Sequence, residues 1–224
     1  MNGTDERPTS GDNRLEATIR LISAYFDSCK VGCAGNSGFR KTTDLSKFSA
    51  CLGELAALGI VNADKTVFAD LGCGDGRVNL LAGYYMKLSI GIEIDPEILA
   101  EYGPRRADVH SIIEREGGIA PRNNIMLFQG SSLNSRTFEK VREKAGVAIG
   151  EVDLFYTYIT LHDVFAELIA EHGRPGAYFL VYGFSKVLPR YDNFDLVIPD
   201  VGSQGIAALF RKPACLDGMP RSLL

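Results

Sequence analysis

A glycine-rich turn follows the short apolar run at residues 66–71, and its composition suits it to hold a ligand. Gly72, Gly74 and Gly76 alternate with a cysteine and an aspartate before the chain reaches Arg77. A ligand lying across the carboxyl end of a strand needs backbone without a Cβ atom, because side chains would hold it away. The spacing is GxGxG, and Arg77 stands where a dinucleotide site would need its third glycine. The turn therefore predicts a ligand-binding loop with an incomplete pyrophosphate fingerprint.

An acidic residue near the end of the next apolar run makes the prediction more specific. Glu93 follows Gly76 by 17 residues and lies in the segment 88–94. An acid at the tip of a second strand lies beside the glycine loop and can accept hydrogen bonds from both ribose hydroxyls of a nucleoside. The loop alone is equally compatible with a structural turn. The loop and the acid together predict a nucleoside site.

Alternating strands and helices are expected to position these groups. Strands are predicted at residues 66–71, 88–94, 125–128, 152–159, 177–184, 194–198 and 206–210. Helices are predicted at 14–27, 47–58, 77–86, 136–144 and 164–171, and one from Pro96 that breaks at Gly103 and Pro104 and resumes at 107–116. Asp44 or Ser46 would cap the second helix. This alternation predicts an α/β fold with a doubly wound, mostly parallel sheet.

The predicted fold has seven strands, and the last two should pair as an antiparallel hairpin at one edge because no helix separates them. Residues 66–212 form the predicted sheet domain, and residues 14–65 form an N-terminal helical lid or extension. Residues 1–13 are predicted to be a disordered leader and residues 213–224 a tail.

Composition excludes several classes of protein. The 224 residues carry 24 Lys+Arg against 28 Asp+Glu, and the net charge of −4 argues against a nucleic-acid partner. The apolar runs are far shorter than the roughly 20 residues of a membrane helix, so no membrane partner is expected. The five cysteines contain no CxxC pair and no histidine at zinc-ligand spacing, so no metal is predicted and a reducing cytoplasm fits best.

The two motifs resemble those of a known family. ADLGCGDGR and GIEIDPEIL are similar to motifs one and two of the class I (seven-β-strand) S-adenosylmethionine-dependent methyltransferases. Residues 153–164 resemble the fourth-strand motif, and residues 174–180 resemble the turn before strand five. The resemblance covers residues 66–212 and implies a Rossmann-like fold, S-adenosylmethionine as cofactor and methyltransferase activity.

The resemblance also implies roles for individual residues. Asp70 and the loop would hold the methionine end of the cofactor, Glu93 the ribose, and Ile94 would pack on the adenine. The family often has an acid after strand three, but Ser131 and Ser132 stand there, so a serine hydroxyl or the backbone must replace it. The full set assigned to the cofactor is Asp70, Gly72, Cys73, Gly74, Asp75, Gly76, Glu93, Ile94, Ser131, Ser132 and Tyr156.

Methyl transfer from a sulfonium is an in-line displacement that depends on positioning, and it needs a base only if the acceptor must first lose a proton. Tyr156, Tyr158 and Thr160 share a face of the fourth strand because side chains alternate. His162 is the best base by residue type, although a structural role is the simpler interpretation. His162 and Tyr156 are the catalytic candidates.

The acceptor is predicted to be a small molecule or a protein side chain. The fourth strand lacks the Asn/Asp-Pro-Pro-aromatic tetrapeptide that marks base or glutamine methylation in this family. Residues 39–44 are similar to a segment of small protein-lysine methyltransferases, and they equally suit a solvated loop before a helix. The N-terminal 65 residues and residues 186–195 are expected to wall the acceptor pocket. A nicotinamide-dependent oxidoreductase and a non-catalytic binding module are the alternative functions.

Overall fold

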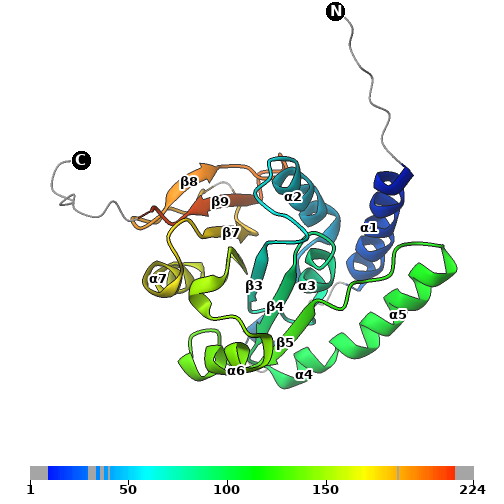
Figure 1. Cartoon of the computed structure of the whole chain (residues 1–224), viewed down its shortest axis with the longest axis horizontal. Coiled ribbons are helices and arrows are strands. Elements are labelled where there is room, and N and C mark those ends of the chain that lie inside the picture. The colour runs from blue at the N-terminus through cyan, green and yellow to red at the C-terminus, as the bar shows by residue number, and fades with distance from the viewer. Residues whose placement is uncertain (1–9, 30–33, 36–37, 40, 186, 215–224) are drawn as a thin grey trace, which may run out of the picture.

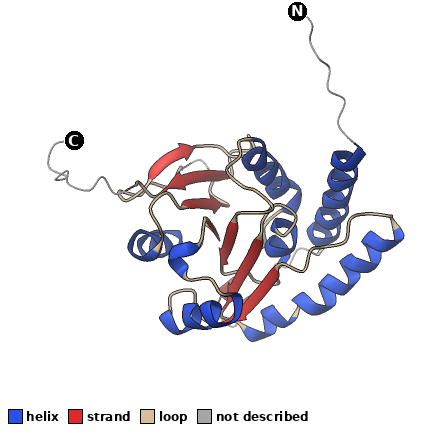
Figure 2. Cartoon of the chain, in the orientation of Figure 1, coloured by secondary structure: helices blue, strands red, loops and turns tan. Residues whose placement is uncertain are grey.

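Strands and helices alternate along the computed structural model, which describes residues 10–29, 34–35, 38–39, 41–185 and 187–214 (Figures 1 and 2). The helices are α1 (Ser10–Ser28), α2 (Leu45–Ala57), α3 (Arg77–Ala82), α4 (Pro96–Ala100), α5 (Tyr102–Arg115), α6 (Ser135–Ala145) and α7 (His162–His172), with a 3-10 turn at Ile149–Glu151. The strands are β1 (Ala34–Gly35), β2 (Gly38–Phe39), β3 (Val67–Leu71), β4 (Leu88–Glu93), β5 (Ile125–Gln129), β6 (Leu154–Tyr158), β7 (Tyr178–Tyr182), β8 (Asp195–Ile198) and β9 (Ala207–Arg211). Among the described helices, none has the length and apolarity needed to span a membrane.

One seven-stranded sheet forms the centre of the fold, in the order β5-β4-β3-β6-β7-β9-β8. The pairs from β5 to β7 are parallel, as expected for strands separated by crossover helices. β9 is antiparallel to both β7 and β8, because only a turn joins β8 to β9. The prediction of a doubly wound, mostly parallel sheet with a terminal edge hairpin is confirmed. β1 and β2 form a separate two-stranded ribbon.

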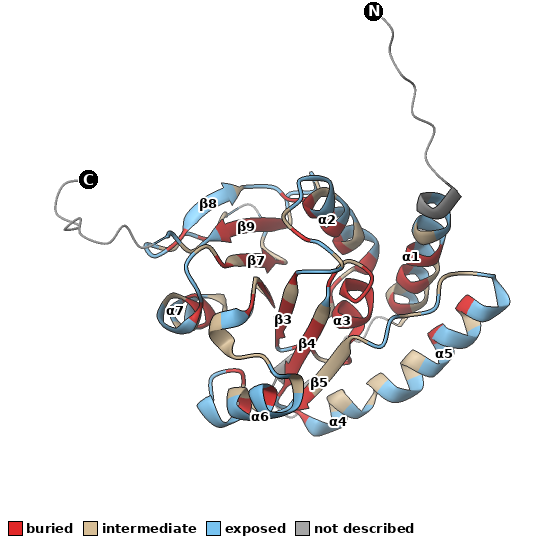
Figure 3. Ribbon diagram, in the orientation of Figure 1, coloured by how far each residue is buried: buried red, intermediate tan, exposed pale blue. Residues whose placement is uncertain are grey.

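Helices cover both faces of this sheet, and each face has its own hydrophobic core (Figure 3). On one face, α1, α2, α3 and α5 contribute buried residues such as Ile22, Phe48, Leu80 and Val109. On the other face, α6 and α7 contribute residues such as Val141, Phe165 and Ile169. The central strands are buried on both sides, which explains why they read as continuous apolar runs rather than alternating ones.

The N-terminal helices share the core of the sheet domain. The Phe48 ring of α2 lies 5.0 Å from the ring of Tyr156 on β6 and 6.1 Å from that of Tyr182 on β7. Asp44 caps α2 by accepting a hydrogen bond from the Lys47 amide, as the sequence predicts. The division of the chain at residue 65 stays a prediction, and the helices on its N-terminal side contribute to the same core as β3 and α3.

The helix after β4 breaks one residue earlier than predicted. α4 ends at Ala100, α5 begins at Tyr102, and the break is at Glu101 rather than at Gly103 and Pro104. Pro104 is the third residue of α5, where the amide hydrogen that proline lacks has no intrahelical partner in any residue type. The proline therefore starts a helix here, whereas the sequence analysis takes it to end one.

Other boundaries moved by a few residues. α1 begins at Ser10, four residues before its predicted start, and residues 1–9 and 215–224 of the predicted leader and tail lie outside the described part. α3 ends at Ala82 instead of residue 86. A Cβ atom on the following residue, Gly83, would lie 3.1 Å from Asn124 and Ile125, so β5 approaches the end of α3 closely.

Candidate functional site

The site lies at the carboxyl ends of β3, β4 and β6, where the sheet changes direction. From β3 the chain adds β4 and β5 on one side and then β6 on the other, so the crossovers diverge at this point. Such a switch point leaves a crevice outside the strand ends, which is where open α/β sheets bind ligands. A cavity of about 240 Å³ opens there. It is lined by residues 41–43, 70–75, 77–78, Glu93, Asp95, Ile98, 156–158, Thr160, Leu161 and Phe165.

The glycine loop, residues 72–76, borders this cavity in a conformation that suits glycine. The backbone of Gly72 has φ 98° and that of Gly76 has φ 71°, a region that residues with a Cβ atom rarely adopt. The amides of Gly72 and Cys73 both donate to the carbonyl of Ile92 at 2.9 Å, which attaches the loop to β4. The loop is therefore held as a rigid rim beside the end of β4.

Glu93 is fixed at the tip of β4 by backbone hydrogen bonds. Its Oε2 accepts from the Gly74 amide and its Oε1 from the Asp95 amide, both at 2.9 Å. The residue is buried and lines the cavity. Each carboxylate oxygen has a second lone pair, so the side chain can still accept hydrogen bonds from a ligand. Its position beside the loop is the arrangement that the 17-residue spacing predicts.

Asp70, at the end of β3, is the most strongly perturbed acid in this cavity. Burial raises the pKa of its carboxyl well above the usual range, and the nearby charges of Glu93 and Asp75 raise it further. A site that disfavours an additional negative charge in this way favours a cation. The acidic side of the cavity therefore suits a ligand with one or more positive groups.

Asp75 has a different environment because two arginines neutralise it. Arg77 Nε lies 3.0 Å from Oδ1, Arg77 Nη2 lies 2.9 Å from Oδ2, and Arg105 Nη1 forms an ion pair with Oδ2 at 2.7 Å. Asp75 and Arg77 are almost completely buried. Asp75 thus reaches the cavity lining with its carboxylate already paired to protein groups.

The structure brings seven of the predicted site residues into this one cavity. They are Asp70, Gly72, Cys73, Gly74, Asp75, Glu93 and Tyr156. Gly76, Ile94, Ser131, Ser132 and His162 lie outside its lining. Ile94 is 55% exposed, and the Ser131 hydroxyl accepts a hydrogen bond from the Leu133 amide. The residues expected at the adenine therefore flank the cavity, and their predicted roles stay predictions.

His162 opens helix α7 and interacts with a tyrosine instead of the cavity. Its Nδ1 lies 2.6 Å from the Tyr191 hydroxyl and 3.1 Å from Asp163 Oδ1. Burial raises the pKa of Tyr191, so that hydroxyl keeps its proton and can donate it to Nδ1. The described part of the predicted acceptor loop, 187–195, thus contributes Tyr191 to this pair and no residue to the cavity lining.

Tyr156 lines the cavity, but its hydroxyl belongs to a buried hydrogen bond. Its Oη lies 2.7 Å from Oγ1 of Thr43, and its ring packs against Phe48 and Phe68. Burial raises the pKa of the Tyr156 hydroxyl well above its usual range. A phenol that keeps its proton cannot accept one, so the structure gives Tyr156 a packing and positioning role rather than that of a base.

We expect Tyr156→Phe to lower the free energy of unfolding by about 1 kcal/mol, because the buried Thr43 hydroxyl loses its partner. Urea unfolding of the variant provides the measurement. Tyr158→Phe, two residues along the same strand, is the matched control and should change stability by less than about 0.5 kcal/mol. Equal losses in both variants would show that the Thr43 hydrogen bond contributes nothing measurable.

The sequence analysis missed two features of the site. Lys41, Thr42 and Thr43 line the cavity from the N-terminal side, although only a weak similarity of residues 39–44 had drawn attention to them. The Asp75–Arg77 pair was visible only as an unexpected residue at the third-glycine position. An acid and an arginine two residues apart inside a glycine-rich loop were the available signal.

Comparisons with known proteins define the fold. No protein-family model matches the chain, and no curated protein matches it. Solved structures do match, and their fold is that of the S-adenosylmethionine-dependent methyltransferases, which this chain adopts.

Two of these structures illustrate the range. An rRNA methyltransferase, aviRa, from Streptomyces viridochromogenes is 14% identical, with 88% of this chain and 92% of that chain covered and a TM-score of 0.52. Phosphoethanolamine N-methyltransferase 1 from Haemonchus contortus, in complex with phosphoethanolamine and S-adenosylhomocysteine, is 10% identical with a TM-score of 0.50. That comparison covers 96% of this chain and 52% of the other, so the chain spans about half its length.

Proposed function

We propose that this protein is an S-adenosylmethionine-dependent methyltransferase. The observation that carries the proposal is the position of Glu93, which is bonded to the Gly74 amide inside the cavity at the switch point, beside Asp70. S-Adenosylmethionine combines a ribose diol with a sulfonium and an ammonium cation. An acid at the strand tip suits the diol, and the acidic cavity suits the cations.

The residues fit this cofactor in distinct ways. Glu93 has lone pairs for the two ribose hydroxyls, and the glycine loop lets the methionine portion approach the backbone. Asp70 would hold the methionine end through its ammonium group. Ile94, Ser131 and Ser132 are proposed on the adenine side, beyond the cavity lining. When bound, the cofactor supplies an electrophilic methyl group, and the chain has to orient it and exclude water around it.

The direct test is calorimetric titration with S-adenosylmethionine and S-adenosylhomocysteine. We expect Glu93→Ala to weaken binding by about tenfold or more, because a hydrogen bond to a charged group contributes about 1.5–3 kcal/mol. Glu97→Ala, at an exposed acid four residues along the chain, is the control and should bind as the wild type does. Absence of wild-type binding at high micromolar cofactor would refute the proposal.

The acceptor is proposed to be a small molecule or a protein side chain, bound on the side of Lys41, Thr42 and Thr43. The net charge of −4 argued against nucleic acid, but a structure described as an rRNA methyltransferase shares this fold. RNA is therefore kept among the acceptors to be tested. Incubating a lysate with methyl-tritiated cofactor and separating protein, RNA and small molecules distinguishes the three classes.

The same experiment separates an enzyme from a binding module. A non-catalytic module would bind the cofactor without releasing S-adenosylhomocysteine in the presence of any fraction. A reducing, cytoplasmic location is also proposed, and the free thiols of Cys29, Cys51 and Cys73 support it.

A further inference from the structure

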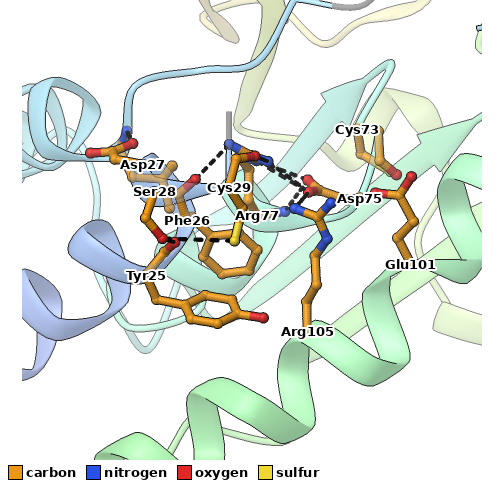
Figure 4. A network of polar contacts seen from close by, with 12 residues as sticks. Tyr25, Phe26, Asp27, Ser28, Cys29, Cys73, Asp75, Arg77, Glu101 and Arg105 are labelled. Carbon is orange, nitrogen blue, oxygen red and sulfur yellow. Dashed lines mark hydrogen bonds and ion pairs between the residues drawn. The ribbon is translucent and has the colours of Figure 1, made fainter. Parts of the chain in front are cut away.

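Arg77 connects the glycine loop to the last turn of α1 (Figure 4). Its guanidinium pairs with Asp75 at the end of the loop, donates from Nη1 to the Phe26 carbonyl and from Nη2 to the Cys29 carbonyl, each at 3.2 Å. The guanidinium carbon also lies 5.3 Å from the centre of the Phe26 ring. One buried side chain therefore contacts two segments that are about 50 residues apart in the sequence.

The same turn of α1 holds the start of α2. The Asp27 carboxylate accepts hydrogen bonds from the Leu45 amide at 2.8 Å, the Ser46 amide at 3.0 Å and the Ser46 hydroxyl at 2.7 Å. These bonds satisfy amides in the first turn of α2 that have no partner within the helix. Asp27 follows Phe26 directly, so the carbonyl that accepts from Arg77 and the carboxylate that caps α2 are adjacent in the chain.

The start of α2 in turn leads to the acceptor side of the cavity. Thr43, two residues before Leu45, is bonded to Tyr156, and the Tyr182 hydroxyl donates to the Asp44 carbonyl at 3.3 Å. Residues 41–43 line the cavity opposite the glycine loop, whereas none of the described residues of α1 lines it. Any influence of α1 on the cavity is therefore indirect and passes through Arg77 and Asp27.

We propose that Arg77 is a positioning residue that sets the glycine loop and residues 41–43 relative to each other, through the last turn of α1. The inference rests on the proposed function, because it takes the glycine loop as the cofactor-binding side. Arginine suits this task because its planar fork reaches a carboxylate and two carbonyls at once. Lysine keeps the charge but cannot make all of these bonds.

Two variants and their combination test the link. Arg77→Lys should raise the dissociation constant of S-adenosylhomocysteine by about tenfold, and Asp27→Ala, outside the cavity, by about threefold. The double variant should bind more tightly than the product of the two effects predicts, because breaking the link once leaves little to lose at its other end. Binding is measured by calorimetry at a temperature where circular dichroism shows each variant folded.

Hydrogen exchange in the ligand-free protein gives a second measurement that a purely local role would not change. Arg77→Lys should accelerate exchange of the Leu45 and Ser46 amides as well as those of the glycine loop. Arg174→Lys is the matched control, because Arg174 pairs with Asp153 outside the cavity lining, and it should change neither cofactor affinity nor this exchange.

The outcomes separate this inference from the proposed function. Wild-type protein that fails to bind S-adenosylhomocysteine refutes the function. Wild-type binding together with unchanged affinity in Asp27→Ala, or strictly multiplicative effects in the double variant, overturns the positioning role of Arg77. If Arg77→Lys does not fold, Asp27→Ala alone decides, through its affinity and through exchange in the glycine loop.

Discussion

Gly76→Ala is expected to lower the free energy of unfolding by about 2–4 kcal/mol and to weaken cofactor binding at least tenfold. The backbone of Gly76 has φ 71°, which costs about 1–2 kcal/mol in a residue with a Cβ atom. An added Cβ would also lie 2.7 Å from Leu127 Cδ1 and from Tyr102 Cδ2, and such overpacking costs about 1–3 kcal/mol. Either the glycine loop or the start of α5 has to move.

Binding should suffer because the displaced groups hold the loop in place. Tyr102 begins the helix that carries Arg105, and Arg105 pairs with Asp75 in the loop. Gly59→Ala provides a matched control, since Gly59 has φ 69° but no atom within 4 Å of an added Cβ. It should cost only the backbone contribution and leave cofactor affinity unchanged. Urea unfolding and calorimetry measure both effects, and equal losses in the two variants would contradict the packing argument.

Asp70→Asn is expected to stabilise the ligand-free protein at neutral pH by at least about 1 kcal/mol, or about 2–4 °C in Tm for a chain of this size. Burial and the charges of Glu93 and Asp75 raise the pKa of Asp70 in the folded state above that in the unfolded state. Between those two pKa values the folded protein binds more protons, so stability falls as the pH rises. Asparagine removes this penalty.

The pH dependence of that gain identifies its origin. The gain should be complete above the folded-state pKa of Asp70 and should shrink as the pH falls toward 4, near the unfolded value. Thermal unfolding of wild type and variant between pH 5 and pH 8 follows it. Asp195→Asn, on the exposed strand β8, is the control and should show no such trend. A gain that does not change with pH would assign the effect to packing instead of charge.

The same substitution should weaken binding of S-adenosylmethionine by about tenfold or more, because a hydrogen bond to a charged group is lost. A cation favours the ionised carboxylate, so binding to the wild type should release protons from Asp70. Calorimetry in buffers of different ionisation heat detects this release, and Asp70→Asn should lack it. A variant that is less stable and binds normally would contradict the assignment of Asp70 to the cationic end of the cofactor.

The order of strands and helices could be predicted because its signals are local. Each of the seven strands of the sheet is a short apolar run bounded by turn residues, and the structure places each within a few residues of its predicted range. The break at Glu101 was misplaced because proline stops a helix in its interior but is accepted in its first turn. A sequence pattern does not state which of the two positions a proline will occupy.

The candidate site was predictable where its residues lie close together in the sequence. The glycine loop and Glu93 come from two consecutive strands, and parallel pairing brings the ends of such strands together. His162 looked like a base from its residue type, but a contact with Tyr191, 29 residues away, takes it out of the cavity lining. Residue type alone could not reveal that partner.

The sequence by itself determined the α/β alternation, the glycine loop and the acid at the end of β4, because periodicity and spacing encode them within about 30 residues. Only the tertiary structure decided that Thr43 meets Tyr156, 113 residues away, and that Arg77 reaches the carbonyls of Phe26 and Cys29. Such contacts arise when crossover helices bring distant segments onto one end of a sheet, and they leave no local pattern. The acidic cavity is likewise a product of burial, which raises the pKa of Asp70 only once the sheet has formed around it.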